Sequence, residues 1–279
     1  MADYILRMKG PDAKGLIYRV TQVLFQNQCN VIRQDEYVSP DEQFFMRTDF
    51  SYEGELNKNK ILGDLQENIS FEGLEITLNQ KAKKNIILFC TKEHHCLAEI
   101  LTRHYFGELN AHIVAVVSNH ETLKPYVDKF GIPYHFVDTE GKTREQHESE
   151  VFKITDLYNF DHMVLAKYMR ILTPEFVERY ADKIINIHHS FLPAFIGANP
   201  YKQAYERGVK IIGATAHFVN NMLDEGPIIA QDTREVDHRY SAADMARDGR
   251  DVEKMVLITA LKLVLDDRVF VHGNRTVIL

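Results

Sequence analysis

The chain has 279 residues, a length that favours two domains, each able to bury a hydrophobic core of its own. Hydrophobic residues make up 45% and charged residues 26% of the sequence, which is the composition of a globular protein and excludes a long disordered segment. A formal net charge of -7 argues against a nucleic acid as the main partner, because binding to a phosphate backbone relies on positive charge.

The N-terminal part of the chain has the pattern of a small α+β domain. Alternating apolar residues predict strands at residues 4–9, 30–37, 43–52 and 74–79. Amphipathic spacing predicts helices at about residues 16–28 and 57–67. The resulting order is βαββαβ, which is that of a ferredoxin-like sandwich.

A short basic segment separates this part from the rest. Residues 80–85 contain Lys81, Lys83 and Lys84 and almost nothing apolar, so we predict an exposed connector and place the domains at 1–82 and 83–279. Beyond it, helical stretches alternate with apolar runs at 86–89, 113–117, 162–166 and 184–187. Buried parallel strands with crossover helices explain this rhythm, and we expect a Rossmann-like, mostly parallel α/β domain.

Two helices of the second domain are indicated by their own signals. Thr173 can cap a helix whose first turn holds Pro174 and Glu175, and this start signal also ends the preceding strand at Leu172. From Tyr240 onward, apolar residues recur with helical spacing, which predicts a long helix packed over the sheet. We interpret that helix as part of the core and not of a site.

Polar residues gather at the carboxyl end of the strand at 184–187. On an extended chain Asn186, His188 and Ser190 point to one side, and ligands of open α/β sheets bind at this edge. Such residues could equally satisfy backbone groups at a strand end. Asp224 follows a further predicted strand at 216–219 and would by itself be read as part of a turn.

Together these two segments resemble the folate-dependent formyltransferases. The motifs are Asn-x-His-x-Ser-x-Leu-Pro at 186–193 and His-Phe-Val-x-x-x-Leu-Asp-x-Gly-Pro at 217–227. In that family the asparagine, histidine and aspartate form the catalytic centre, so the resemblance implies this role for Asn186, His188 and Asp224. It also implies a substrate pocket formed by Met169, Arg170, Ile171, Leu172, Ser190, Leu223 and Gly226.

The three residue types suit attack on a formyl group. Negative charge grows on the formyl oxygen as its carbon is attacked, and an amide donor such as Asn186 can stabilise that oxyanion. His188 can donate a second hydrogen bond or shuttle a proton, while Asp224 can raise its basicity and hold the attacking water.

The loop after the first strand of the second domain indicates the acceptor of the formyl group. Family members that use a phosphorylated amine have a Gly-rich turn there, where backbone N–H groups cradle phosphate. This chain has Thr-Lys-Glu-His-His-Cys at 91–96, without glycine and with the negative charge of Glu93. His189 also replaces the proline that is common in the transferases. An acceptor without phosphate is implied, and water is the simplest.

With its N-terminal half included, the chain resembles the formyltetrahydrofolate deformylases over its whole length, including residues 208–215 and 269–276. The resemblance implies hydrolysis of 10-formyltetrahydrofolate to formate and tetrahydrofolate, without a permanently bound cofactor. In this family the reaction feeds purine biosynthesis and balances the one-carbon pool. Two alternatives stay open, which are a formyltransferase acting on a small unphosphorylated amine and a non-catalytic amino-acid sensor that binds folate.

The N-terminal half carries a second resemblance. Pro-Asp-Ala-Lys-Gly-Leu at 11–16, entering a helix within βαββαβ, resembles an ACT domain, a regulatory module that commonly binds amino acids at a dimer interface. The resemblance implies glycine or methionine as effector, Gly15 and Asn30 as its contacts, and a homo-oligomer. A plain turn before a helix is the alternative.

Metal and serine chemistry are not expected. His94, His95 and Cys96 are adjacent, and no ligand cluster at suitable spacing completes a site. His217 is interpreted as a strand histidine near the site. A Gly-x-Ser-x-Gly elbow does not occur, which argues against a covalent serine hydrolase.

Three cysteines without a Cys-x-x-Cys pair suggest no disulfide framework. The N-terminus lacks an apolar leader, and no apolar run approaches membrane-spanning length. We therefore expect a cytoplasmic protein without a membrane partner.

Overall fold

The computed structural model describes residues 2–69, 73–194 and 200–279, and the chain divides into two compact units. Unit 1 comprises Met1–Ala82, Asp267–Phe270 and Val277–Leu279, whereas unit 2 comprises Lys83–Asp266 and Val271–Thr276. The chain therefore leaves unit 1 after Ala82 and returns to it with residues near the C-terminus.

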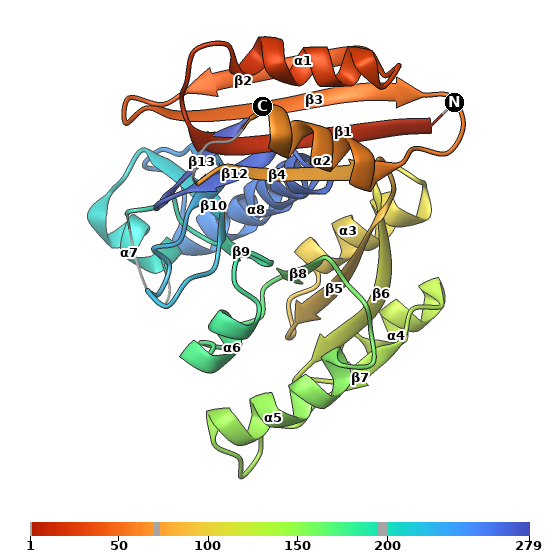
Figure 1. Ribbon diagram of the computed structural model, residues 1–279. Helices are drawn as coiled ribbons and strands as arrows, with labels where there is room; N and C mark the ends of the chain where they lie inside the picture. The colour runs from red at the N-terminus through yellow and green to blue at the C-terminus, as the bar shows by residue number, and fades with distance from the viewer. Residues whose placement is uncertain (1, 70–72, 195–199) are drawn as a thin grey trace. The chain divides into compact units, whose positions relative to one another are not determined.

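Unit 1 contains an antiparallel sheet and two helices. Its elements within the described residues are β1 (Ala2–Pro11), α1 (Leu16–Gln26), β2 (Asn30–Val38), β3 (Gln43–Tyr52), α2 (Lys58–Asn68) and β4 (Glu75–Gln80). The sheet order is β2-β3-β1-β4, with each neighbouring pair antiparallel (Figure 1). The predicted order βαββαβ is thus observed, and the predicted strand at 43–52 has its expected bounds.

Both helices of unit 1 pack on one face of this sheet. Alternate residues of β1, namely Tyr4, Leu6 and Met8, point to that face, as the two-residue period of a strand requires. They form one buried cluster with Leu16 of α1 and Ile61 of α2. The apolar spacing that predicted the helices is therefore the spacing that builds this core.

The C-terminal residues complete a second, smaller core in unit 1. Phe270 and Leu279 are buried with Phe45 of β3, whose ring meets Phe270 edge to face with centroids 5.7 Å apart. The Arg7 guanidinium lies over the Phe270 ring at 4.3 Å and donates a hydrogen bond to the carbonyl of Val269. The boundary predicted at 82/83 places all of 83–279 in the second domain, and this return of the chain is a correction to it that sequence spacing does not reveal.

Unit 2 alternates strands and helices. Its elements within the described residues are β5 (Lys84–Cys90), α3 (His95–Tyr105), β6 (Ala111–Ser118), α4 (Lys124–Val127), the 3-10 turn η1 (Asp128–Phe130), β7 (Tyr134–Phe136), α5 (Arg144–Thr155), β8 (His162–Leu165), α6 (Pro174–Arg179), β9 (Ile184–His188), α7 (Pro200–Arg207), β10 (Ile211–Phe218), β11 (Ile228–Glu235) and α8 (Ala242–Leu265). A terminal hairpin follows, formed by β12 (Val269–His272) and β13 (Arg275–Ile278).

The sheet of unit 2 has the order β11-β10-β9-β8-β5-β6-β7 across the described residues. The pairs from β9 through β7 are parallel, and β10 pairs antiparallel with both β9 and β11. The predicted mostly parallel α/β sheet is confirmed. Residues 86–89 of β5 are fully buried, as expected for a central strand covered on both faces.

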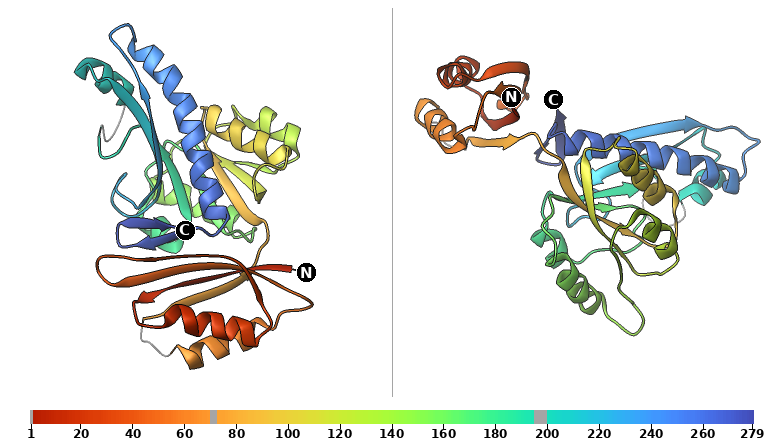
Figure 2. Two further views of the ribbon diagram at one scale, coloured as in Figure 1. Left: turned by 90° about the horizontal axis from the view of Figure 1, so that it is seen from above. Right: turned by 90° about the vertical axis from the view of Figure 1, so that its right-hand side faces the viewer.

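The long predicted helix corresponds to α8, which packs against β9, β10 and β11. Figure 2 shows it as the long blue helix beside the teal strands of the sheet. Ser241 caps α8 by accepting a hydrogen bond from the backbone N–H of Asp244. Among the described residues, no helix combines the length and the apolar character needed to cross a membrane.

The segment before α6 departs from the prediction. Thr173 caps α6 as predicted, accepting a hydrogen bond from the Phe176 N–H. The preceding strand does not reach Leu172, however, because β8 ends at Leu165. Lys167 adopts the left-handed φ of 63°, which breaks an extended chain, and Thr91 Oγ1 holds its carbonyl at 2.8 Å. Residues 166–172 therefore form a loop.

Candidate active site

A cavity of about 480 Å³ lies at the carboxyl edge of β8 and β9. Three segments supply most of its lining, namely the loop 167–172, the end of β9 at 186–189 and the loop 219–224. This is the sheet edge at which open α/β folds bind their ligands. Asn186, His188 and Asp224 all line this one cavity.

Strand pairing brings the polar residues of this cavity together. Asn186 and His188 are two residues apart on β9 and share a face. His217 of the antiparallel strand β10 lies directly opposite Asn186 in the register. The Asn186 Nδ2 donates to His217 Nε2 at 3.2 Å. Asp224 then closes the group, with its Oδ2 at 3.3 Å from His188 Nδ1 and its Oδ1 at 4.0 Å from His217 Nε2.

His217 fixes the orientation of the Asn186 amide. Its Nδ1 donates to the Phe218 carbonyl at 2.8 Å, which leaves Nε2 as an acceptor in the neutral imidazole. Burial lowers the pKa of His217, which favours that neutral form. One N–H of Asn186 satisfies Nε2, so the second N–H remains available to the cavity that Asn186 lines. Sequence analysis gave His217 no such role, although its position opposite Asn186 follows once the strands are paired.

His188 and Asp224 form a buried acid–base pair. Burial alone would raise the pKa of Asp224, but the hydrogen bond from His188 and the nearby imidazoles outweigh it and hold that pKa below its ordinary value. Asp224 is therefore ionised at neutral pH. His188 Nε2 is buried and has no hydrogen-bond partner among residues 2–69, 73–194 and 200–279. That nitrogen is placed to exchange a proton with a bound molecule.

Of the other residues expected to bind substrate, five line the cavity and two do not. The cavity is lined by Met169, Arg170, Ile171, Leu172 and Leu223. Ser190 and Gly226 do not line it. The Ser190 hydroxyl donates to the Ala194 carbonyl at 2.5 Å, and a Cβ at Gly226 would lie 1.8 Å from the Phe218 carbonyl oxygen. We therefore interpret those two positions as structural supports.

Arg144 also lines the cavity, which sequence analysis did not anticipate. It lies at the start of α5, and with Arg170 it gives the cavity two cationic side chains. Such groups suit a ligand that carries carboxylates. The two proposed effector residues lie in unit 1, where Gly15 precedes α1 with a φ of 83° and Asn30 begins β2.

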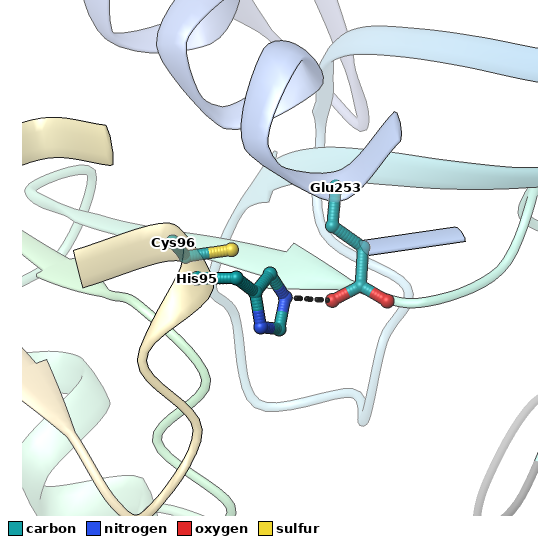
Figure 3. Close-up of side chains that lie close together, drawn as sticks. All are labelled: His95, Cys96 and Glu253. Atoms are coloured by element: carbon teal, nitrogen blue, oxygen red, sulfur yellow. Dashed lines mark hydrogen bonds and ion pairs between the residues drawn. The ribbon is translucent and has the colours of Figure 1, made fainter. Parts of the chain in front are cut away.

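A buried carboxylate receives three donors beside this cavity. Glu253 Oε2 lies 2.8 Å from His95 Nε2 and 3.1 Å from Lys167 Nζ, and Tyr201 donates to Oε1 at 2.6 Å. Figure 3 shows the His95 ring pointing at the carboxylate of Glu253, which comes from α8. Burial alone would raise the pKa of Glu253, but the His95 hydrogen bond and the Lys167 charge hold it at about 2.

These residues raise the question of a metal site. Ligand atoms of His95, Cys96 and Glu253 lie within 4.8 Å of one another. However, the Lys167 ammonium already neutralises the carboxylate and would repel a cation placed there. Both carboxylate oxygens also hold hydrogen bonds. We therefore interpret the group as an ion-pair network.

Sequence analysis missed Glu253 because we read α8 as apolar core. A usable signal was present, since Glu253 falls on the buried helical face together with Gly249, Val252 and Val256. A charged residue on such a face requires a partner. The partners come from loops distant in sequence, and spacing alone does not identify them.

Three comparisons relate the chain to known proteins. A family model described as formyl transferase matches residues 84–261. The formyltetrahydrofolate deformylase of Escherichia coli (strain K12) is 53% identical over 276 residues, which cover 99% of this chain and 98% of that protein. A crystal structure of a formyltetrahydrofolate deformylase from Pseudomonas syringae pv. tomato str. DC3000 has a TM-score of 0.95 and 39% identity, and the match covers 100% of this chain and 95% of that one.

A further solved structure matches a smaller share of the chain. The crystal structure of glycinamide ribonucleotide transformylase 1 from Symbiobacterium toebii has a TM-score of 0.67 and 28% identity. The match covers 94% of that chain but 70% of this one.

The Glu253 network predicts a specific pH dependence of stability. The folded pKa of about 2 lies below the ordinary 4.5, so the ionised carboxylate stabilises the fold above about pH 4.5 and loses this contribution as pH falls toward 2. Glu253→Gln lacks the contribution at every pH. We expect the difference in unfolding free energy between wild type and variant to shrink on acidification by up to about 3 kcal/mol. Urea unfolding at stepped pH measures it, and a difference that stays constant from pH 6 to pH 3 would contradict the assignment.

Proposed function

Because this chain belongs to the formyltetrahydrofolate deformylases, we propose that Asn186, His188 and Asp224 carry out its hydrolytic step. The enzyme hydrolyses 10-formyltetrahydrofolate to formate and tetrahydrofolate. The observation that supports the residue assignment is the meeting in one cavity of an amide donor, an ionised carboxylate and an imidazole whose Nε2 has no partner in the described part of the chain. Hydrolysis is supported over formyl transfer to a small amine because the relatives that share half or more of their residues with this chain are deformylases.

The proposed first step is attack by water. Asp224 Oδ1 accepts a hydrogen bond from the water, whose oxygen bonds to the formyl carbon as its proton passes to His188 Nε2. The carbonyl electron pair moves onto the formyl oxygen. Asn186 stabilises the resulting oxyanion through the N–H that His217 leaves available.

The second step releases the products. The oxyanion re-forms its double bond, and the bond between carbon and N10 breaks with its electron pair going to nitrogen. His188, now protonated and supported by the Asp224 carboxylate, returns its proton to that nitrogen. Formic acid and tetrahydrofolate result, and formic acid ionises to formate.

The cavity lining suits the rest of a folate. Met169, Ile171 and Leu223 are half-exposed apolar side chains that can contact a flat ring system. Arg170 and Arg144 can pair with the carboxylates of the glutamate tail. We assign substrate binding to Met169–Leu172 and Leu223. The formate that is released is proposed to supply purine biosynthesis, and the reaction to balance the one-carbon pool.

Unit 1 is proposed as a ferredoxin-like ACT domain that regulates this activity. Its element order and its antiparallel sheet order β2-β3-β1-β4 support that reading. Gly15 adopts a left-handed conformation at the start of α1, which a glycine tolerates and which leaves backbone groups open to a small ligand. Glycine or methionine is the proposed effector, with Asn30 as a further contact.

A homo-oligomer is proposed from an exposed sheet edge. β2 is the outer strand of the unit 1 sheet, and Ile32, Tyr37 and Val38 on it are exposed. An exposed apolar edge strand is a template for pairing with a second copy. We place the enzyme in the cytoplasm, which suits its three free cysteines.

The catalytic assignment is tested with 10-formyltetrahydrofolate and no added amine. We expect Asn186→Ala and Asp224→Asn each to lower turnover at least about a hundredfold, because each removes a group that acts on the transition state. Formate release and the absorbance of tetrahydrofolate measure it. Asp182→Asn is the matched control, since Asp182 is an exposed aspartate with the same left-handed backbone, φ 58° against 57° for Asp224. Near-wild-type turnover in either site variant would refute its role.

Regulation is tested in the full-length enzyme. Turnover is measured with glycine or methionine added, in wild type and in Asn30→Ala. We expect one of the amino acids to change turnover severalfold in wild type, and the amino-acid concentration that gives half of this change to rise about tenfold or more in the variant. That factor corresponds to the loss of about one good hydrogen bond. A response that is the same in both proteins would remove Asn30 from the effector site.

A further inference from the structure

The central crevice of the unit 2 sheet is filled by the protein's own side chains. The sheet grows from β5 through β6 to β7 on one side and from β8 through β9 on the other, so the strand order reverses between β5 and β8. Open α/β sheets bind ligands in the crevice beyond the carboxyl ends of the strands at such a reversal. Here Lys167 follows β8 and His95 follows β5, and both bind the carboxylate of Glu253.

Lys167 stands next to the catalytic residues in the sheet. Leu165 of β8 pairs with Asn186 of β9 in the parallel register. Lys167 follows Leu165 by two residues, in the loop after β8, and its side chain lines the same cavity as Asn186 and His188. The pKa of His189, which lines the same cavity, is lowered to about 4 by burial and next by the positive charge of Lys167. The charge of Lys167 is therefore felt by side chains of this cavity.

The side chain of Lys167 is held firmly in place. Its backbone has a left-handed φ of 63°, which a lysine rarely adopts, and its carbonyl accepts a hydrogen bond from Thr91 Oγ1. Lys167 is 4% exposed and Glu253 is 1% exposed. Withdrawing the ammonium would leave a buried carboxylate without its counter-ion, which is strongly unfavourable.

Tyr201 closes the far side of the carboxylate. Its hydroxyl binds Glu253, and its ring packs so closely on α8 that a Cβ at Gly249 would lie 2.1 Å from the hydroxyl oxygen. Glycine at that position therefore allows the tyrosine to approach the helix. His95, Lys167 and Tyr201 thus all bind the one carboxylate of Glu253, and the four side chains hold one another in position.

We propose that the Lys167–Glu253 pair, braced by His95 and Tyr201, determines the choice of formyl acceptor by filling the switch-point crevice, so that water reaches the formyl carbon and an amine does not. The proposal rests on the proposed function and deepens it. An amine must bring its nitrogen within about 3.5 Å of the carbon while its substituents extend away from it. With the folate bound in the rest of the cavity, as proposed above, those substituents need the space that Lys167 fills. A water molecule, with a volume of about 30 Å³, needs no such space.

Lys167→Gly tests the proposal because glycine accepts the left-handed backbone while removing the side chain. The full-length enzyme is given 10-formyltetrahydrofolate and glycinamide, and the ratio of formylglycinamide to formate is measured against an enzyme-free blank. We expect this ratio to rise at least tenfold over wild type. Lys167→Met, which keeps most of the side-chain length, is expected to retain the wild-type ratio. Asp182→Gly places glycine at an exposed left-handed position outside the cavity and is also expected to retain it.

The outcomes separate this proposal from the proposed function. A folded Lys167→Gly with an unchanged ratio, or a Lys167→Met whose ratio rises as much, would overturn the role of the filled crevice. If the single glycine variant does not fold, Lys167→Gly with Glu253→Gln removes the unpaired charge, and the same two results decide. A wild type that releases no formate without amine but formylates added glycinamide would instead overturn hydrolysis itself, and the acceptor proposal with it.

Discussion

The register between β9 and its two neighbours is the constraint on which the rest of the site depends. The antiparallel pairing with β10 sets His217 opposite Asn186, and the parallel pairing with β8 sets Leu165 opposite the same residue. A shift of one residue would turn Asn186 and His188 to the other face of the sheet. The amide, the imidazole and the loop after β8 would then no longer face one cavity. Precise strand pairing in a buried sheet is thus what positions the chemistry.

Sequence reasoning succeeded where the signal was local. The strand signal along β3 and the helical spacing in α1 predicted those elements within a few residues, because both signals lie in neighbouring residues. The Thr173 cap was likewise readable from three neighbouring residues. At the site, spacing placed Asn186 and His188 on one side of a strand, and the structure has both lining one cavity. The motif resemblance, and not the spacing, supplied the distant Asp224.

It failed where the deciding interaction joined distant segments. The strand expected to end at Leu172 ends at Leu165, because Lys167 turns into a left-handed conformation that local propensity does not favour. Glu253 was read as part of an apolar face, since its partners Lys167 and His95 lie far away in the chain. The folded sheet brings these three together, and no spacing rule contains that information. The last residues of the chain were misassigned for the same reason.

The return of the C-terminus to unit 1 has a consequence for the order in which the protein is completed. Residues 83–266, the larger part of unit 2, are in topology an insertion between the N-terminal piece of unit 1 and its C-terminal residues 267–270 and 277–279. Phe45 is synthesised early, yet the aromatic ring that covers it belongs to Phe270. A chain growing from a ribosome therefore exposes that patch of the first sheet during most of its synthesis. Unit 1 is therefore synthesised first but completed last, and its final stability depends on C-terminal residues that are translated after the whole sheet of unit 2.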